Sequence, residues 1–273
     1  MRILYTSDLH GKTWLYEELF QRAKSENVDC LIIGGDLLPA YRGNPVRGQR
    51  EFLKEYLLNR LRTFNVSSPS TSIYLMMGND DWKINMDLLE EADGSILHLL
   101  HLKKHAIGNA YLMGYGFVDV TPFGNKDWEK WDNSTRTSPY ARLKGFVSTK
   151  SGLEETCFDP ADRSDTIEND LERLARESDP AQTIYVMHAP PYHTKLDRTA
   201  NGPVGSQAVR DFVTKYQPKL TLHGHVHESP HLTGHYGEQI GNTIAVNPGQ
   251  GDQLHAVLFD IEDPARTITH TIL

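Results

Sequence analysis

Short apolar runs and amphipathic segments alternate along much of the chain. The apolar runs, whose length and composition are typical of buried strands, cover residues 3–7, 30–33, 73–77, 183–187 and 220–222. Apolar positions near helical spacing predict crossover helices at 14–27 and 51–64, and further helices are expected at 166–177 and 206–216. Strands and helices that alternate in this way indicate an α/β protein.

The final part of the chain and one internal segment depart from this alternation. Strands are predicted at 232–246, 256–261 and 267–272 without long helices between them, so antiparallel or mixed pairing is expected. Two facing sheets with helices on their outer sides accommodate both patterns. Between 118 and 165 the pattern breaks into charged, aromatic and turn-forming residues. This break predicts a lid-like insertion within a single domain that spans 1–273.

Composition narrows the class of protein. A chain of 273 residues with 38% hydrophobic content can bury one large core. Its net charge of −8 argues against nonspecific binding to nucleic acid or to anionic membranes, because such binding needs a basic face. The sequence has no apolar stretch of membrane-spanning length, and its two cysteines, Cys30 and Cys157, do not make a disulfide framework. We therefore expect a cytoplasmic protein.

Residues of metal-ligand type follow five of the predicted strands. They form the clusters Asp8-x-His10, Gly35-Asp36, Gly78-Asn79-Asp80-Asp81, His188 and Gly224-His225-x-His227. Because ligands of α/β sheets bind in the crevice beyond the carboxyl ends of the strands, we expect these clusters to meet in one place.

The donor set indicates two divalent metal ions. Carboxylate and imidazole without thiolate suit Mn, Fe, Zn, Co or Ni better than a closed structural zinc site. One carboxylate can bridge two ions roughly 3.5–4 Å apart so that a shared water attacks phosphorus in line. Asp36 is the candidate bridge. Four positive charges on the ions, against one negative charge each on Asp8 and Asp36, leave a surplus of about two for an anionic substrate.

The order of the five clusters resembles that of the calcineurin-like metallophosphoesterase superfamily, and the resemblance covers nearly the whole chain. It implies a four-layer α-β-β-α sandwich of two mixed sheets flanked by helices. It also implies two metal sites that share one carboxylate, with neutral Asn79 limiting the negative charge near phosphate. The first site would consist of Asp8, His10, Asp36 and His227, and the second of Asp36, Asn79, His188 and His225.

His223 makes the last cluster ambiguous. It precedes His225 by the same two residues that separate His225 from His227, so spacing alone cannot choose the ligand pair. The family motif selects His225 and His227. The resemblance extends to the late turn Asn247-Pro248-Gly249, although Gln250 follows where the family commonly has serine.

Position 80 departs from the family, which usually has a histidine after Gly-Asn that stabilises the phosphate and protonates the leaving group. This chain has Asp80 there. Two nearby cations keep an aspartate ionised, so we expect a poor general acid that repels phosphate oxygens. His193 and His223 are candidates to replace the acid, because both are close in sequence to ligand segments. An alternative role for Asp80 and Asp81 is to cap a helix at 82–86.

Candidate substrate contacts lie in the insertion and in one later loop. Lys126 and Arg142 could touch phosphate while neighbouring aromatic residues, among them Trp128 and Trp131, stack on a base. Backbone N–H groups near Ser206, before a predicted helix, could bind an anion. The alternatives are a solvated loop or a subunit contact for the insertion, and an ordinary helix start at Ser206.

These observations predict a dinuclear metal-dependent phosphoesterase that hydrolyses phosphodiesters by metal-activated water. The alternatives are a phosphomonoesterase and a catalytically weak metal-binding scaffold. The expected substrate is a phosphorylated small molecule or a nucleotide-like compound, and oligomer formation is compatible with the sequence. A Gly-rich phosphate loop, a dinucleotide fingerprint and a Gly-x-Ser-x-Gly nucleophile elbow are all missing from the sequence.

Overall fold

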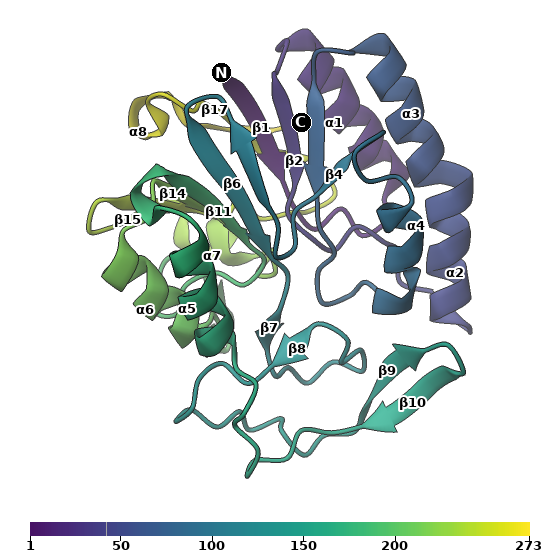
Figure 1. Ribbon diagram of the computed structural model, residues 1–273, viewed down its shortest axis with the longest axis vertical. Helices are drawn as coiled ribbons and strands as arrows, with labels where there is room; N and C mark the ends of the chain where they lie inside the picture. Colours follow the sequence, from purple (N-terminus) through teal and green to yellow (C-terminus); the bar gives the residue numbers. More distant parts are fainter. Residues whose placement is uncertain (42) are drawn as a thin grey trace.

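Two six-stranded mixed sheets lie face to face at the centre of the molecule (Figure 1). The computed structural model describes residues 1–41 and 43–273 of the chain. In the first sheet, β1 to β4 are parallel, β17 pairs antiparallel with β1, and β18 pairs antiparallel with β17. Its strands in spatial order are β18 (Thr269–Ile272), β17 (His255–Asp260), β1 (Arg2–Thr6), β2 (Cys30–Ile33), β3 (Ser72–Leu75) and β4 (His98–Leu99).

The second sheet has four parallel central strands and an antiparallel strand at each edge. β6, β11, β14 and β16 are parallel, whereas β5 and β15 pair antiparallel with β6 and β16. Its strands in spatial order are β15 (Gly237–Ile240), β16 (Thr243–Val246), β14 (Leu220–Leu222), β11 (Thr183–Met187), β6 (Ala110–Tyr115) and β5 (Lys104–Ile107).

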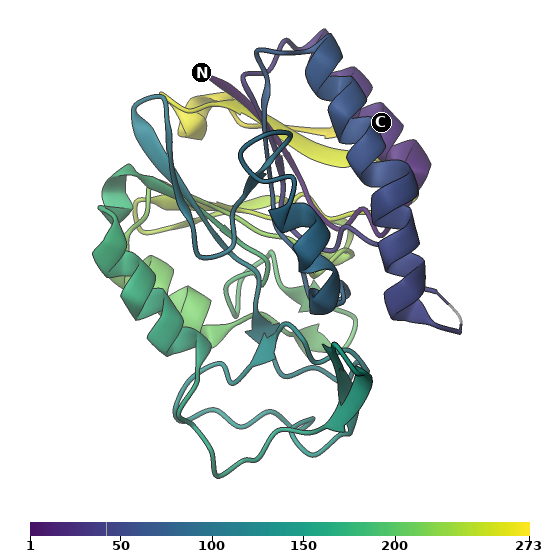
Figure 2. The same ribbon diagram turned by 45° about the vertical axis from the view of Figure 1, so that its right-hand side comes forward.

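Helices cover the outer face of each sheet, and Figure 2 shows the resulting layers from a second angle. The first sheet is covered by α1 (Thr13–Ser25), α2 (Pro45–Phe52), a π-helical segment (Leu53–Leu57), α3 (Leu58–Ser67) and α4 (Met86–Glu90). The second is covered by α5 (Ile167–Glu177) and α6 (Gln207–Tyr216). Shorter helices are α7 (Ser229–Thr233), α8 (Pro264–Thr267) and two 3₁₀ turns at Lys83–Asn85 and Pro180–Gln182. The expected four-layer α-β-β-α sandwich is confirmed.

The central strands are buried on both faces, which explains why they read as almost continuous apolar runs. In β1, Ile3 and Tyr5 pack into the core between the two sheets, whereas Leu4 packs into the core beneath the helices. In β2, Ile32 faces the other sheet and Leu31 faces the helices. Successive side chains of a strand point to opposite faces, so a strand between two hydrophobic layers needs apolar residues at every position.

The strands β5 and β6 were not predicted, and two predicted boundaries differ from the structure for reasons of local chemistry. The helix expected at 51–64 begins at Pro45, because Asn44 accepts a hydrogen bond from the Arg47 backbone N–H and caps the first turn. The strand expected from 232 begins at Gly237 instead, since Leu232 belongs to α7. That helix ends at Gly234, whose φ of 72° suits the left-handed conformation of a helix C-terminus.

The segment 118–165 contains little regular structure. It holds two short parallel strands, β7 (Val118–Asp119) and β8 (Glu129–Lys130), and a hairpin of β9 (Gly145–Thr149) and β10 (Gly152–Thr156). Outside this segment, β12 (Arg198–Thr199) and β13 (Gly202–Pro203) form another short antiparallel pair. The segment 118–165 lies beyond the carboxyl ends of β1 and β2 (Figures 1 and 2). Within the described part of the chain, every helix is too short or too polar to cross a membrane.

Candidate metal centre

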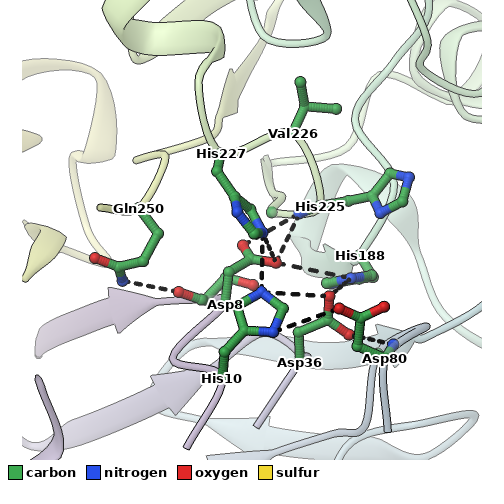
Figure 3. A network of polar contacts seen from close by, with 12 residues as sticks. Asp8, His10, Asp36, Asp80, His188, His225, Val226, His227 and Gln250 are labelled. Atoms are coloured by element: carbon green, nitrogen blue, oxygen red, sulfur yellow. Dashed lines mark hydrogen bonds and ion pairs between the residues drawn. The ribbon is translucent and has the colours of Figure 1, made fainter. Parts of the chain in front are cut away.

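The five clusters meet at the carboxyl ends of parallel strands from both sheets. Asp8 follows β1, Asp36 follows β2 and Asn79 follows β3 in the first sheet, while His188 follows β11 in the second. His225 and His227 follow β14, also in the second sheet, and Figure 3 shows them above Asp8, Asp36 and His10. The two sheets therefore meet at one polar crevice beyond these strand ends, and each supplies part of it.

The backbone turns sharply at the clusters. Asp8, His10, Asp36 and His225 have positive φ angles of 61°, 45°, 49° and 64°, which are uncommon outside glycine. Backbone hydrogen bonds hold these turns together: the Asp8 N–H donates to Gly35 O at 3.0 Å, and the His10 N–H donates to Asp36 O at 2.9 Å. Such conformations cost about 1–3 kcal/mol each and cluster at functional sites.

One group of donor atoms comes from Asp8, His10, Asp36 and His227. One ligand atom of each lies within 4.8 Å of all the others, the arrangement expected of residues that could hold a single ion. His10 Nε2 lies 3.0 Å from His227 Nε2, and His227 Nε2 lies 3.3 Å from Asp8 Oδ1. His10 Nε2 is 3.9 Å from Asp36 Oδ2.

A second group shares Asp36 with the first. It joins Asp36 with His188 and His225, again within 4.8 Å. Asn79 adds an amide oxygen, because its Oδ1 lies 3.1 Å from His188 Nε2. His188 Nδ1 donates to the Gly34 carbonyl at 3.0 Å, which directs Nε2 toward the crevice.

The centre concentrates negative charge that calls for a positive counterpart. Burial lowers the pKa of His188, but Asp36 and Asp8 outweigh it and raise the value to about 10. Burial also lowers the pKa of His227, but the neighbouring Asp8 carboxylate outweighs this effect and raises the pKa to about 9. The protons on these imidazoles balance the buried carboxylates. A divalent cation held by the same atoms would displace the protons, since metal binding requires the deprotonated ligand.

Glycines let the clusters approach one another. A Cβ at Gly78 would lie 2.4 Å from Asp36 Oδ1 and 2.7 Å from His188 Nε2. A Cβ at Gly224 would lie 2.1 Å from Ser7 Oγ and 2.4 Å from Asp8 Oδ2. Any side chain at either position would push carboxylates out of the crevice, so only glycine fits here.

Asp81 has a role that the sequence did not suggest. Its buried carboxylate accepts hydrogen bonds from the backbone N–H groups of Leu37, Leu38 and Gly78 at 3.0, 2.8 and 2.9 Å. It thereby joins the loop after β2 to the loop after β3. The helix-cap interpretation of Asp80 and Asp81 is wrong, because the 3₁₀ turn that follows has Trp82 at its N-terminal cap position and no side-chain cap.

The late turn fixes the loop that carries His225 and His227. Asn247 Nδ2 donates to three carbonyls, among them Gly224 O at 3.3 Å and Val226 O at 3.1 Å. Gln250 Nε2 donates to Ser7 O at 2.9 Å, next to Asp8 (Figure 3). The turn therefore supports ligand loops from both sheets without entering the donor groups.

His223 does not lie in the crevice. Its Nδ1 donates to the carbonyls of Met187 and Ala189 at 2.9 and 3.0 Å, and its Nε2 contacts Thr221 Oγ1 at 2.9 Å. The ring is fully buried, and burial lowers its pKa to about 4. The proposal that His223 protonates a leaving group is therefore corrected, because both ring nitrogens are engaged elsewhere.

His193 is an exposed residue of the loop after β11 and has a φ of 56°. Its backbone N–H and that of Thr194 both donate to the buried Asp197 carboxylate at 3.0 Å, which fixes this strained turn. A role for its ring as the general acid stays a prediction.

Two expected substrate contacts are occupied by other parts of the protein. Lys126 Nζ is buried and donates to Thr121 O at 2.8 Å and to Glu129 Oε2 at 2.9 Å, so it is not free to meet phosphate. Ser206 Oγ caps α6 by accepting from Val209 N–H at 3.0 Å, and it donates to Asp132. The Gln207 N–H also donates to Asp132, at 2.8 Å. The anion at this helix N-terminus is thus the protein's own carboxylate.

The aromatic residues expected to stack on a base are also occupied. Trp128 is fully buried and Trp131 is 4% exposed. Trp131 packs edge-on against Phe158 and carries the Arg163 guanidinium 3.4 Å from its ring centroid. Base stacking on these two rings is therefore excluded. Arg142 is exposed, and its contact with a substrate remains a prediction.

Comparison with known proteins agrees with this geometry. The calcineurin-like phosphoesterase family matches residues 1–229. The chain therefore belongs to the calcineurin-like phosphoesterases, a family of hydrolases. No curated protein sequence matches it.

Solved structures with the same fold share little sequence with the chain. One crystal structure is 17% identical at a TM-score of 0.67, and the alignment covers 99% of this chain and 98% of that one. TT1561 of Thermus thermophilus is 18% identical at a TM-score of 0.62, with the same coverage. A dimetal phosphatase from Danio rerio is 10% identical at a TM-score of 0.54, over 94% of this chain and 91% of the other. At these identities the likeness establishes the fold alone.

Proposed function

We propose that this protein is a dinuclear metal-dependent phosphoesterase that hydrolyses phosphodiesters by metal-activated water. The observation that carries the proposal is the pair of donor groups that share Asp36 at the strand ends. Asp8, His10, Asp36 and His227 would hold the first ion, and Asp36, Asn79, His188 and His225 the second. The substrate would be a phosphorylated small molecule or a nucleotide-like compound.

The donor atoms fit divalent ions of the Mn, Fe, Zn, Co and Ni group. Neither donor group contains a thiolate, and each combines carboxylate with imidazole, as those ions prefer. Two such ions, when bound, supply Lewis-acid charge and lower the pKa of water so that it can attack phosphorus. The protein's own groups hold the ligands: Gly34 O orients His188, and the Asp8 carboxylate is fixed by the His225 N–H at 3.0 Å.

The charge of the centre favours a phosphodiester over a phosphomonoester. Asp80 lies at the crevice together with Asp8 and Asp36. These three carboxylates carry three negative charges, whereas two divalent cations carry four positive charges. The remaining surplus of about one positive charge matches a diester monoanion better than a monoester dianion. In addition, His223 and Lys126 are unavailable to the leaving group, which favours substrates whose leaving group departs without strong protonation.

The segment 118–165 would act as an insertion of the single domain that covers the entrance to the centre. Three hydrogen bonds tie it to the chain that follows Asn79: Asn125 Nδ2 donates to Asp81 O at 3.2 Å, the Lys83 N–H to Asp127 Oδ2 at 2.8 Å, and the Ile84 N–H to Ser148 Oγ at 3.0 Å. A shift of the insertion would therefore also displace residues 81–84, which follow the proposed ligand Asn79.

The decisive experiment compares Mn²⁺-dependent hydrolysis of bis(p-nitrophenyl) phosphate with that of p-nitrophenyl phosphate. Asp36→Ala serves as the control for contaminating phosphatases, because it removes the carboxylate shared by both donor groups. We expect faster diester cleavage that the control abolishes. Faster monoester cleavage would replace the diester proposal with a phosphomonoesterase. Bound metal without turnover of either compound would identify a metal-binding scaffold.

A further inference from the structure

Asp80 is an unexpected residue beside a two-metal centre, because a third carboxylate adds negative charge where an anionic substrate must bind. Its backbone is held firmly at the crevice: the Asp80 N–H donates to Asp36 Oδ1 at 2.8 Å, and its carbonyl accepts from Gln49 Nε2 at 2.9 Å. The side chain is 42% exposed and lies beside Asp36 (Figure 3). A residue fixed in this way is suited to hold its neighbours in place.

The two carboxylate oxygens of Asp80 face two different ligand residues. Oδ1 accepts a hydrogen bond from Asn79 Nδ2 at 2.9 Å. Oδ2 lies 3.5 Å from His10 Nδ1. Asn79 belongs to the proposed second metal site and His10 to the first, so one side chain contacts a ligand of each.

The contact with Asn79 sets the direction of its amide. Because Nδ2 donates to Asp80, the other branch of the amide must be the oxygen, and Oδ1 lies 3.1 Å from His188 Nε2. The oxygen is the atom that can bind a cation, whereas the NH₂ group would repel one. Asp80 therefore selects the useful orientation of the amide.

The contact with His10 sets the position of its ring proton. Nε2 is the atom that joins the first donor group, 3.0 Å from His227 Nε2. When a cation takes the lone pair of Nε2, the proton must reside on Nδ1, which faces Asp80 Oδ2. A carboxylate at this position fixes the tautomer and orientation of a metal-binding histidine and makes it a more basic ligand.

We propose that Asp80 is a positioning residue that orients one ligand of each metal site, His10 and Asn79, in place of the acid that the family usually has at this position. An imidazole at position 80 could not do this, since it lacks two acceptor oxygens for two donors. The inference rests on the proposed function, because it assumes that both donor groups hold ions. Its consequence is a more rigid ligand set without leaving-group protonation by residue 80.

Two substitutions separate the two contacts. Asp80→Ala removes both acceptors. Asp80→Asn keeps the shape and one acceptor oxygen but presents an NH₂ group to the other donor, so it can serve only one of the two ligands. Glu90→Gln is the matched control, because it removes one negative charge from an exposed position of α4. The side chain of Asp80 is partly exposed, so both variants should fold, and circular dichroism checks this.

The readout is Mn²⁺ binding to the full chain by calorimetry and equilibrium dialysis, which does not depend on turnover. We expect Asp80→Ala to weaken the binding of each ion by roughly 10–100-fold, the usual effect of losing an outer partner of a ligand. Asp80→Asn should weaken the binding of one ion only, and Glu90→Gln should bind both ions with the affinity of the parent protein. In the Zn²⁺-loaded parent protein, ¹⁵N NMR should find the proton of His10 on Nδ1 and protected from exchange, with that protection lost in Asp80→Ala.

The outcomes distinguish failure of this inference from failure of the proposed function. Parent protein that binds two ions, together with Asp80→Ala that binds both equally well, would overturn the positioning role while leaving the function intact. Parent protein that binds fewer than two ions would overturn the proposed function, and the positioning role with it.

Discussion

The four aspartates of the five sequence clusters have different surroundings, and these divide their roles. Asp81 uses its carboxylate on three backbone N–H groups and lies outside both donor groups. Asp8 and Asp36 also accept backbone N–H groups, yet each still has an oxygen within 3.3 Å of an imidazole in the crevice. Asp80 faces two ligand residues from outside the donor groups. Identical side chains thus act as a structural tie, as candidate ligands and as a positioning group.

His223 and His227, which lie on either side of His225, provide a prediction at the scale of single residues. His227→Ala should weaken binding of one ion by at least the roughly 10–100-fold that loss of an outer partner costs. Its side chain is 37% exposed, so the fold should be retained. His223→Ala should keep both ions but cost about 1–3 kcal/mol of stability, because buried carbonyls of Met187 and Ala189 lose their donor.

Metal content per folded molecule and chemical denaturation measure these two effects separately. The ligand choice would be wrong if His223→Ala lost an ion and His227→Ala kept both. A His223→Gln variant is the conservative control, since its amide NH₂ can still donate within the core.

At the scale of elements, the proposed insertion (residues 118–165) is joined to the body of the protein through a helix terminus. Asp132 comes from the insertion, and its buried carboxylate accepts from Ser206 Oγ and from the Gln207 N–H at the start of α6. A negative charge at a helix N-terminus is favourable, because it meets the positive end of the helix dipole and unpaired N–H groups. Arg136 of the insertion lies 3.6 Å from the same carboxylate and stacks 4.2 Å above Tyr192, on the loop after His188.

This junction predicts the effect of Asp132→Ala. The variant leaves the Gln207 N–H and the Ser206 hydroxyl without their acceptor, at a cost of about 1–3 kcal/mol. We expect a lower melting temperature and faster proteolysis within residues 133–165. Asp162→Ala is the matched control, since it removes an exposed acidic residue of the same segment. Equal proteolysis of the two variants would show that the junction does not anchor the insertion.

At the scale of the whole molecule, the proposed centre connects the two sheets. Asp8, His10, Asp36 and Asn79 come from the first sheet, whereas His188, His225 and His227 come from the second. Ions that bind both sets would therefore add cross-links between the two halves of the sandwich. A ligand that binds only the folded state stabilises it by mass action.

Metal removal tests this connection. At a free Mn²⁺ concentration of 100 times the dissociation constant, stabilisation by one ion is about 2.7 kcal/mol, which corresponds to a shift of several degrees in melting temperature. We expect chelation to lower the melting temperature and added Mn²⁺ to restore it. Asp36→Ala should show a much smaller shift in calorimetry, because both donor groups lose their common member. A metal-independent melting temperature in the parent protein would contradict this prediction.

The sequence by itself predicted most of the main strands and helices and the positions of the five clusters, but it did not predict β5 and β6 of the second sheet. These features can be read locally. A strand buried on both faces is an apolar run, and a helix buried on one face has apolar residues at helical spacing. The ligand-type residues follow directly after the strands. The family motif also preferred His227 over His223, and the structure places only the His227 ring among the donor groups. Boundaries such as the start of α2 depended on single capping residues and were less accurate.

Only the tertiary structure decided which polar groups were free and which were occupied. Ser206 meets Asp132 across 74 positions of sequence, and the Leu37 N–H meets Asp81 across 44. His223 turns toward carbonyls 34 and 36 positions away, so its spacing to His225 carries no information about its partners. Spacing along a chain reports the direction of a side chain within one element, whereas its partners depend on how separate elements pack. For that reason the candidate ligands could be listed from sequence, while the roles of Asp80, Asp81 and Asp132 required the folded chain.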